Sequence, residues 1–175
     1  MGARAALQLA LTQPDTWQGL ILISGNPGIE TATERLARRQ TDAKLAERIE
    51  REGLPQFLDF WQSLPMIRSQ ANIPRELRAP MQANRQQHSA IGLANSLRQF
   101  GQGNCPNQWP ELHKITCPIL CMSGEQDQKY HQIAQRIAQE QPSVQHIGIP
   151  QVGHMPQLEA LAACSTAIRR FIKGL

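Results

Sequence analysis

Asp127 and His154 are the two side chains whose types and surroundings best fit acid–base chemistry in this 175-residue sequence. Asp127 follows the apolar run 118–122 through the turn Ser-Gly-Glu-Gln, and His154 comes 27 residues later within Gly-His-Met. A carboxylate that bonds an imidazole fixes the ring tautomer and stabilises the protonated ring. Either residue alone would more often be structural, but together they predict a proton-transferring site.

The elements around these residues would place them at one edge of a sheet. The runs 119–122 and 144–149 read as strands, and a helical pattern through Ile133 and Ile137 separates them. Asp127 and His154 each follow one of these strands. Because open parallel sheets hold their sites at the carboxyl ends of the strands, we expect the two side chains to meet there.

The remaining pattern predicts an α/β fold that is interrupted by a helical cap. A helix over 2–13 precedes the strand 20–23, whose bare Leu/Ile run is typical of a parallel strand covered on both faces. A closing helix is expected over 156–172. Residues 30–103 show no good strand, and their helical stretches are broken by proline. The helical faces there are expected to consist of Leu36, Leu45 and Ile49, then Phe57, Leu58, Trp61 and Leu64, with breaks at Pro65, Pro74 and Pro80.

We therefore expect one domain in three segments. Residues 1–29 would hold a turn, a helix and a strand, residues 30–103 the cap, and residues 104–175 the core with the acid and histidine loops. A length of 175 residues with 41% hydrophobic content suffices for one core.

Positive charge is concentrated in the predicted cap. Residues 35–98 hold ten arginines and one lysine against six acids, a balance of +5, whereas the whole chain carries +4. Guanidinium groups bind carboxylates in pairs of hydrogen bonds, so the segment suits a small anionic ligand. The ordinary alternative for any one of these arginines is a solvated helix face.

Other features exclude several classes of protein. No run of about 18 apolar residues is present, which argues against a membrane span. Fourteen of the eighteen cations are arginine and no basic tract interleaves with aromatics, so nucleic acid is not the expected partner. The four cysteines lack zinc or disulfide spacing, which predicts no metal site and a reduced, cytoplasmic protein. We expect a monomer or a small homo-oligomer.

Sequence frames in this chain resemble a known family. PILCMSGEQDQKY and VGHMPQLE resemble the acid and histidine loops of α/β-hydrolases, and Met-Gly-Ala-Arg at 1–4 resembles the end of a G-x-S-M-G-G-R nucleophile elbow. RRQTD, FLDFWQSLPMI and NRQQHSAIGLANSLRQFGQG are similar to the cap of the 2-succinyl-6-hydroxy-2,4-cyclohexadiene-1-carboxylate synthases of menaquinone and phylloquinone biosynthesis. The resemblance covers nearly the whole chain, and Ala3 replaces the usual second glycine of the elbow.

This resemblance implies an α/β-hydrolase fold and a lyase that eliminates pyruvate without a metal or an organic cofactor. A triad of serine, His154 and Asp127 would remove a proton next to the succinyl ketone, and the backbone N–H of Met1 would join the oxyanion hole. The implied substrate carries several carboxylates. Its binding residues would be Arg4, Arg38, Arg85 and Trp61, with Arg39 replacing Arg38 if the helix register shifts by one and Arg98 as a further contact.

Two other functions stay open at this stage. One is a hydrolase of small esters or thioesters, although an esterase for neutral substrates would have little use for a cap of charge +5. The other is a non-catalytic fragment or module that binds an anionic ligand. In the register of the elbow motif the serine falls directly before Met1, so the 175 residues alone are expected to be inactive. The strand 20–23 would then present an unpaired apolar edge that favours aggregation.

Overall fold

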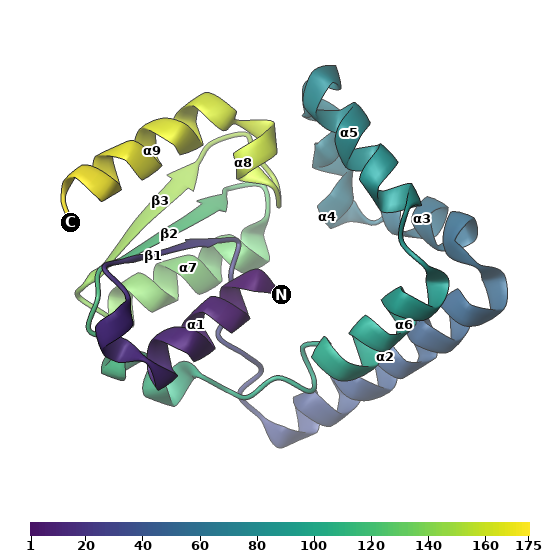
Figure 1. The fold of residues 1–175 in the computed structure, drawn as a ribbon, viewed down its shortest axis with the longest axis horizontal. Helices are drawn as coiled ribbons and strands as arrows, with labels where there is room; N and C mark the ends of the chain where they lie inside the picture. The colour runs from purple at the N-terminus through teal and green to yellow at the C-terminus, as the bar shows by residue number, and fades with distance from the viewer. The chain divides into compact units, whose positions relative to one another are not determined.

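Three parallel strands form the sheet of this chain, described by a computed structural model of residues 1–175 (Figure 1). They are β1 (Leu20–Ile23), β2 (Ile119–Gly124) and β3 (Val144–Ile149). β2 lies between the other two and pairs in parallel with both, so that β1 forms one edge of the sheet. The three predicted strands are confirmed, and β2 runs two residues beyond its predicted end.

Helices cover both faces of this sheet, which explains why its strands are so apolar. Successive residues of β2 point to opposite faces. Ile119 and Cys121 pack in one buried cluster with side chains of α1 (Gly2–Thr12) and α7 (Gln128–Glu140), whereas Leu120 and Met122 pack in a second with side chains of α9 (Leu161–Lys173). Every residue of β2 is buried. Burial of a large apolar side chain such as Ile119, Leu120 or Met122 contributes about 1.5–3 kcal/mol to stability.

Contacts divide the chain into two units. The sheet unit comprises Met1–Pro27, Ser69–Pro74 and Gln108–Leu175, and the helical unit comprises Gly28–Arg68 and Arg75–Asn107. The sheet unit also contains short helical turns, which are η1 (Pro14–Thr16), η2 (Ser69–Asn72), η3 (Trp109–Lys114) and α8 (Pro156–Glu159). The helical unit contains α2 (Ala32–Glu52), α3 (Leu54–Gln62), α4 (Pro65–Arg68), α5 (Arg75–Gln86) and α6 (Ala90–Phe100). Its lack of strands agrees with the sequence.

The long helix α2 is built on clear start and stop signals. The hydroxyl of Thr31 accepts the backbone N–H of Glu34 at 3.1 Å, and the helix ends at Gly53, whose φ of 86° suits glycine. One residue of the apolar face predicted for this helix was wrong, because Leu36 is 53% exposed. The buried positions of α2 are Asp42, Ala46 and Ile49, which follow one another at helical spacing.

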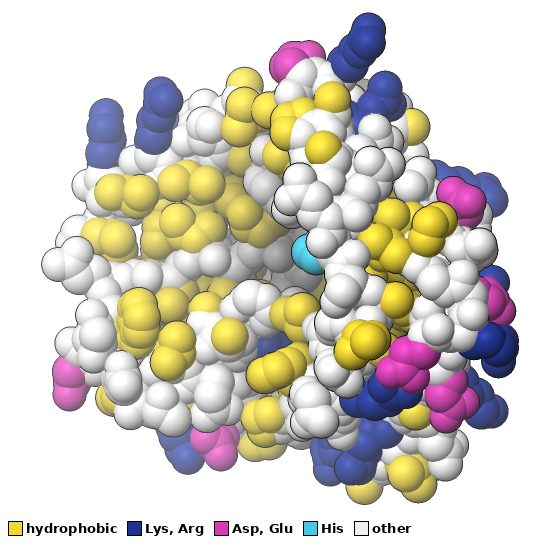
Figure 2. All heavy atoms as spheres, turned by 45° about the vertical axis from the view of Figure 1, so that its right-hand side comes forward, with side chains coloured by type: hydrophobic (Ala, Val, Ile, Leu, Met, Phe, Trp, Pro, Cys, Tyr) yellow, Lys and Arg dark blue, Asp and Glu magenta, His cyan; other side chains and the backbone are white.

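Charged side chains of both signs lie next to each other over the helical unit, on the lower right of Figure 2. Arg98 binds both carboxylate oxygens of Glu50 at 2.5 and 2.7 Å, and Arg48 binds Glu52 at 2.7 Å. Part of the positive charge of this segment is thus paired within the unit. None of the helices combines the length with the hydrophobicity that a membrane span requires.

Two helical expectations were wrong. Pro80 does not break a helix but lies inside α5, where it removes only one backbone donor from a ladder that continues on both sides. The single closing helix is divided in two, because Ala160 adopts φ −142° and ψ 58°, outside the helical range, between α8 and α9.

The close approach of α1 to the end of β1 yields a test of the packing. A methyl group at position 25 would lie 2.9 Å from Cβ of Ala3. We expect Gly25→Ala to lower the free energy of unfolding by about 1–3 kcal/mol through overpacking. In the background of Ala3→Gly, a change that itself costs up to about 1 kcal/mol of helix stability, Gly25→Ala should cost much less. Urea unfolding of the four proteins measures this coupling, and equal costs in both backgrounds would contradict it.

Candidate active site

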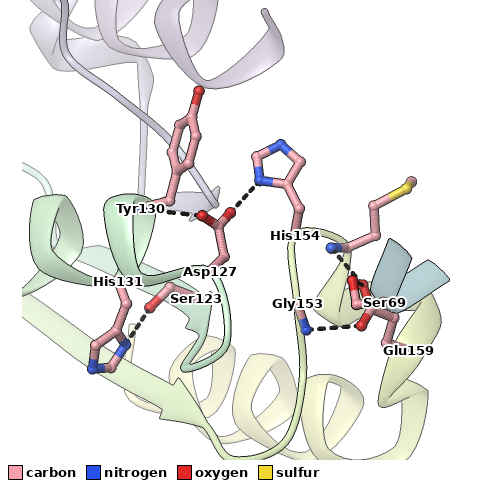
Figure 3. A network of polar contacts seen from close by, with 9 residues as sticks. Ser69, Ser123, Asp127, Tyr130, His131, Gly153, His154 and Glu159 are labelled. Atoms are coloured by element: carbon pink, nitrogen blue, oxygen red, sulfur yellow. Dashed lines mark hydrogen bonds and ion pairs between the residues drawn. The ribbon is translucent and has the colours of Figure 1, made fainter. Parts of the chain in front are cut away.

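Asp127 and His154 meet as the sequence predicts. Nδ1 of His154 lies 2.5 Å from Oδ2 of Asp127 (Figure 3). The Asp127 side chain is 5% exposed and that of His154 is 26% exposed. Because an ionised carboxylate only accepts hydrogen bonds, Nδ1 is the donor in this pair, and Nε2 is the ring nitrogen that the carboxylate does not bind. The partly open ring can therefore exchange a proton with a bound molecule.

Backbone contacts hold the loop of Asp127 against the loop of His154. The N–H of Glu125 donates to Ile149 O at 3.0 Å, and the N–H of Gln126 donates to Val152 O at 2.9 Å. Gly124 lies so close to this second loop that a Cβ there would meet the carbonyl oxygens of Val152 and Gly153 at 2.2 Å. The two loops thus form one hydrogen-bonded layer at the carboxyl edge of β2 and β3.

The start of α7 holds the carboxylate and supports the imidazole. Asp127 is the N-cap of α7, and its Oδ1 lies 3.5 Å from the backbone nitrogen of Tyr130. The buried ring of Tyr130 packs beside His154, with centroids 4.7 Å apart and planes at 60°. Sequence reasoning missed Tyr130. Its spacing of three residues from a helix-capping aspartate was the available signal.

Met1 and Arg4 lie at the first turn of α1. Met1 is the N-cap, and its carbonyl accepts the backbone N–H of Arg4 at 3.0 Å. The carbonyl of Arg4 accepts the side-chain amide of Gln108 at 3.2 Å, and the Arg4 side chain is half-buried. Both residues belong to the sheet unit, as Asp127 and His154 do.

Arg38 lies in the helical unit and already has protein partners there. Its Nε donates to Asp42 at 2.8 Å and its Nη1 donates to Gln102 at 3.2 Å. Asp42 is nearly buried, and its other carboxylate oxygen has no partner. Arg39 is exposed, and its side chain lies against Gly103. Of the two neighbouring arginines, Arg38 therefore lies on the half-buried face of α2.

Arg85 and Trp61 are brought together by the helical unit. The guanidinium carbon of Arg85 lies 4.4 Å from the centroid of the Trp61 ring. Burial lowers the pKa of Arg85 from its ordinary value, although a guanidinium stays charged. Stacking on an aromatic ring orients the planar guanidinium group. The guanidinium of Arg98 donates to both carboxylate oxygens of Glu50.

No three histidine, cysteine, aspartate or glutamate side chains gather where they could hold a metal ion. The four cysteines are free, and three of them, Cys117, Cys121 and Cys164, are buried. Burial raises the pKa of the Cys121 thiol to about 12, so this thiol stays protonated at neutral pH.

A second polar cluster lies between β2, β3 and α7. The hydroxyl of Ser123 lies 3.0 Å from Nδ1 of His131 and 2.9 Å from Nε2 of His146, and the two rings are 5.1 Å apart. A single hydroxyl can bond both rings if it donates to one and accepts an N–H from the other. Burial lowers the pKa of His146, and repulsion from His131 lowers it further.

The fold is that of a known class of proteins. The profile of the alpha/beta hydrolase family matches residues 1–167. The chain belongs to this family, and the predicted fold class is confirmed.

Within that class, the chain is similar to particular synthases. It is 33% identical over all 175 residues to the putative 2-succinyl-6-hydroxy-2,4-cyclohexadiene-1-carboxylate synthase of Bacillus subtilis (strain 168), and it spans 64% of that relative. The solved structure of MenH from S. aureus is 33% identical, with a TM-score of 0.93 over 98% of this chain and 65% of that one. These likenesses confirm the resemblance predicted from the cap frames.

A more distant likeness shows the fold alone. A thermophilic esterase from Thermogutta terrifontis is 23% identical, with a TM-score of 0.80 over 99% of this chain and 62% of that one.

The lowered pKa of His146 predicts a pH dependence of stability. Because the unfolded residue titrates near 6.5 and the folded one lower, the unfolded chain binds more protons between these values. The contribution of His146 to the free energy of unfolding is therefore complete above pH 6.5. It decreases as the pH drops through 6.5 and levels off below the pKa of His146 in the folded chain. Unfolding free energies measured between about pH 7.5 and 5.5 should fall less in His146→Gln than in the parent. His113→Gln, at an exposed histidine, is the control and should keep the parental slope.

Proposed function

We propose that this chain carries the acid, the histidine and the cap of an enzyme that eliminates pyruvate from a succinyl-enolpyruvyl-hydroxycyclohexene-carboxylate in menaquinone or phylloquinone biosynthesis. The observation that carries the proposal is the hydrogen-bonded Asp127–His154 pair. It occurs in a chain that is similar along its whole length to the putative 2-succinyl-6-hydroxy-2,4-cyclohexadiene-1-carboxylate synthase of B. subtilis. The B. subtilis relative extends beyond the matched region, so the proposal concerns the activity of a longer protein.

His154 supplies the base in this scheme. Asp127 holds Nδ1, so Nε2 can take a proton from a serine that, in the register of the elbow motif, directly precedes Met1. The activated oxygen removes the proton next to the succinyl ketone, and the electrons of that C–H bond form an enolate. These electrons then make a new ring double bond, the existing ring double bond shifts toward the carbon that bears enolpyruvate, and the C–O bond breaks with its electron pair going to the leaving oxygen. The released enolpyruvate gains a proton at carbon and becomes pyruvate.

The first turn of α1 suits the stabilisation of that enolate. Met1 is the N-cap of the helix, where backbone N–H groups and the helix dipole favour negative charge. We propose that the N–H of Met1 joins the oxyanion hole and that Arg4, in the same turn, binds a carboxylate.

Arg38, Arg85 and Trp61 bind the substrate in this proposal. The substrate carries three carboxylates, whose charge arginines can balance. Arg85 is oriented by stacking on Trp61, and Arg38 is held by Asp42 and Gln102. We propose a small carboxylate-bearing molecule as the ligand. We also propose a cytoplasmic location, which the four free cysteines support.

A chimaera tests the reaction. The region of the B. subtilis synthase that this chain does not match is joined ahead of Met1, and pyruvate release from the pathway intermediate is followed with a lactate dehydrogenase couple. We expect pyruvate release to exceed hydrolysis of a p-nitrophenyl ester, and the 175 residues alone to release none. His154→Ala should reduce kcat roughly a thousandfold, while His113→Ala leaves it unchanged. Faster ester hydrolysis would favour a hydrolase, and binding without turnover would favour an anionic-ligand module.

The stacked arginine gives a second prediction for the same chimaera. Arg85→Met removes a charged donor, so KM for the intermediate should rise about tenfold with a smaller change in kcat. Arg75→Met, which removes an exposed arginine from the same helix, is the matched control and should leave KM unchanged. Equal effects of the two substitutions would show that only the general charge of the helix matters.

A further inference from the structure

The carboxylate of Glu159 binds the histidine loop on both sides of His154. Its Oε2 accepts the backbone N–H of Gly153 at 2.8 Å, and its Oε1 accepts the backbone N–H of Met155 at 3.0 Å (Figure 3). Gly153 and Met155 are the immediate neighbours of His154. Hydrogen bonds to a charged acceptor are stronger than neutral ones, so one side chain restrains the backbone at both ends of the histidine.

Ser69 provides a further contact to the same carboxylate. Its hydroxyl donates to Oε1 of Glu159 at 3.2 Å, although 90 residues separate the two. The segment 69–74 interrupts the helical unit in sequence but belongs to the sheet unit, where Gln70 and Ile73 are buried. Ser69 therefore sits on an anchored piece of chain and can restrain the Glu159 side chain.

The packing at Gly153 shows how tight this arrangement is. A Cβ at position 153 would lie 1.9 Å from Oγ of Ser69 and 3.2 Å from Oε2 of Glu159. Only glycine leaves room for both the serine and the carboxylate. Gly153, the residue before His154, is thus packed directly against the side chains of Ser69 and Glu159.

Capping alone does not account for all of these bonds. Met155 is the N-cap of the four-residue α8, so the bond from Met155 to Glu159 resembles the reach of a side chain back to a cap N–H. The bonds of Glu159 to Gly153 and Ser69 lie outside that helix and serve no capping purpose. They fix the chain on the other side of the histidine.

We propose that Glu159, held by Ser69, is a positioning residue for His154. Asp127 fixes the imidazole through its ring nitrogen, and Glu159 fixes it through the backbone. With both restraints the direction of the ring is set from two sides, and Nε2 points to one place. The inference rests on the proposed function only in that His154 acts as the base there.

NMR spectroscopy of the 175-residue chain tests this proposal without requiring turnover. Glutamine has one acceptor oxygen, and its NH₂ group would face a backbone N–H, so Glu159→Gln cannot keep all three bonds. We expect the downfield resonance of the proton between His154 and Asp127 to broaden or vanish. Amide exchange at Gly153 and Met155 should quicken about tenfold, as for a lost bond of about 1.4 kcal/mol. Ser69→Ala should act in the same direction more weakly.

The matched control is Glu140→Gln, which removes a carboxylate paired with Arg136 in the same unit and should leave the His154 resonance unchanged.

In the chimaera, Glu159→Gln should lower kcat about tenfold with little change in KM. Faster amide exchange with an unchanged His154 resonance and kcat would mean a merely structural role and would overturn the proposal. If Glu159→Gln does not fold, the His154 resonance, the amide exchange rates and kcat of Ser69→Ala test the proposal instead. A chimaera that releases no pyruvate, with the NMR response intact, would reject the proposed function alone.

Discussion

The site depends on the close contact between two loops at the carboxyl edge of the sheet. Gly124 brings the backbone of the acid loop against Val152 and Gly153, and two backbone hydrogen bonds join the loops. Any side chain at position 124 would push them apart. The short bond between Asp127 and His154 follows from this contact, because each residue lies within a few positions of it. Parallel pairing of β2 with β3 brings the two loops to one edge in the first place.

The arginines of the helical unit differ in their surroundings in a way that composition cannot show. Arg98 and Arg48 pair with glutamates on the surface, and such exposed pairs contribute little to stability. Arg38 pairs with the buried Asp42, and Arg85 stacks on the ring of Trp61 and is itself partly buried. An oriented guanidinium loses less freedom when it binds a ligand. The arginines therefore lie in several different environments, and the role predicted for their excess in binding an anion stays a prediction.

Sequence alone was sufficient for the strands and for the central pair. The short apolar runs that form β1 and β2 favour covered strands because turn residues bound them, and the ends of β2 and β3 locate Asp127 and His154. Local signals failed where tertiary packing decides. The helix at Pro80 continues despite the missing donor, and the helix at Ala160 stops without a proline or glycine. The contact of Ser69 with Glu159 spans 90 residues and leaves no periodic trace.

The path of the chain between the two units bears on how such caps can be exchanged between proteins. The chain passes from one unit to the other four times, after Pro27, Arg68, Pro74 and Asn107. The helical unit is thus two insertions separated by a short core segment, and not one removable block. A cap transplanted as the continuous stretch 28–107 would carry a foreign version of 69–74 into the host core. A graft that keeps the host's own six residues there would preserve the surroundings of its histidine, so the boundaries of recombination matter as much as the cap that is chosen.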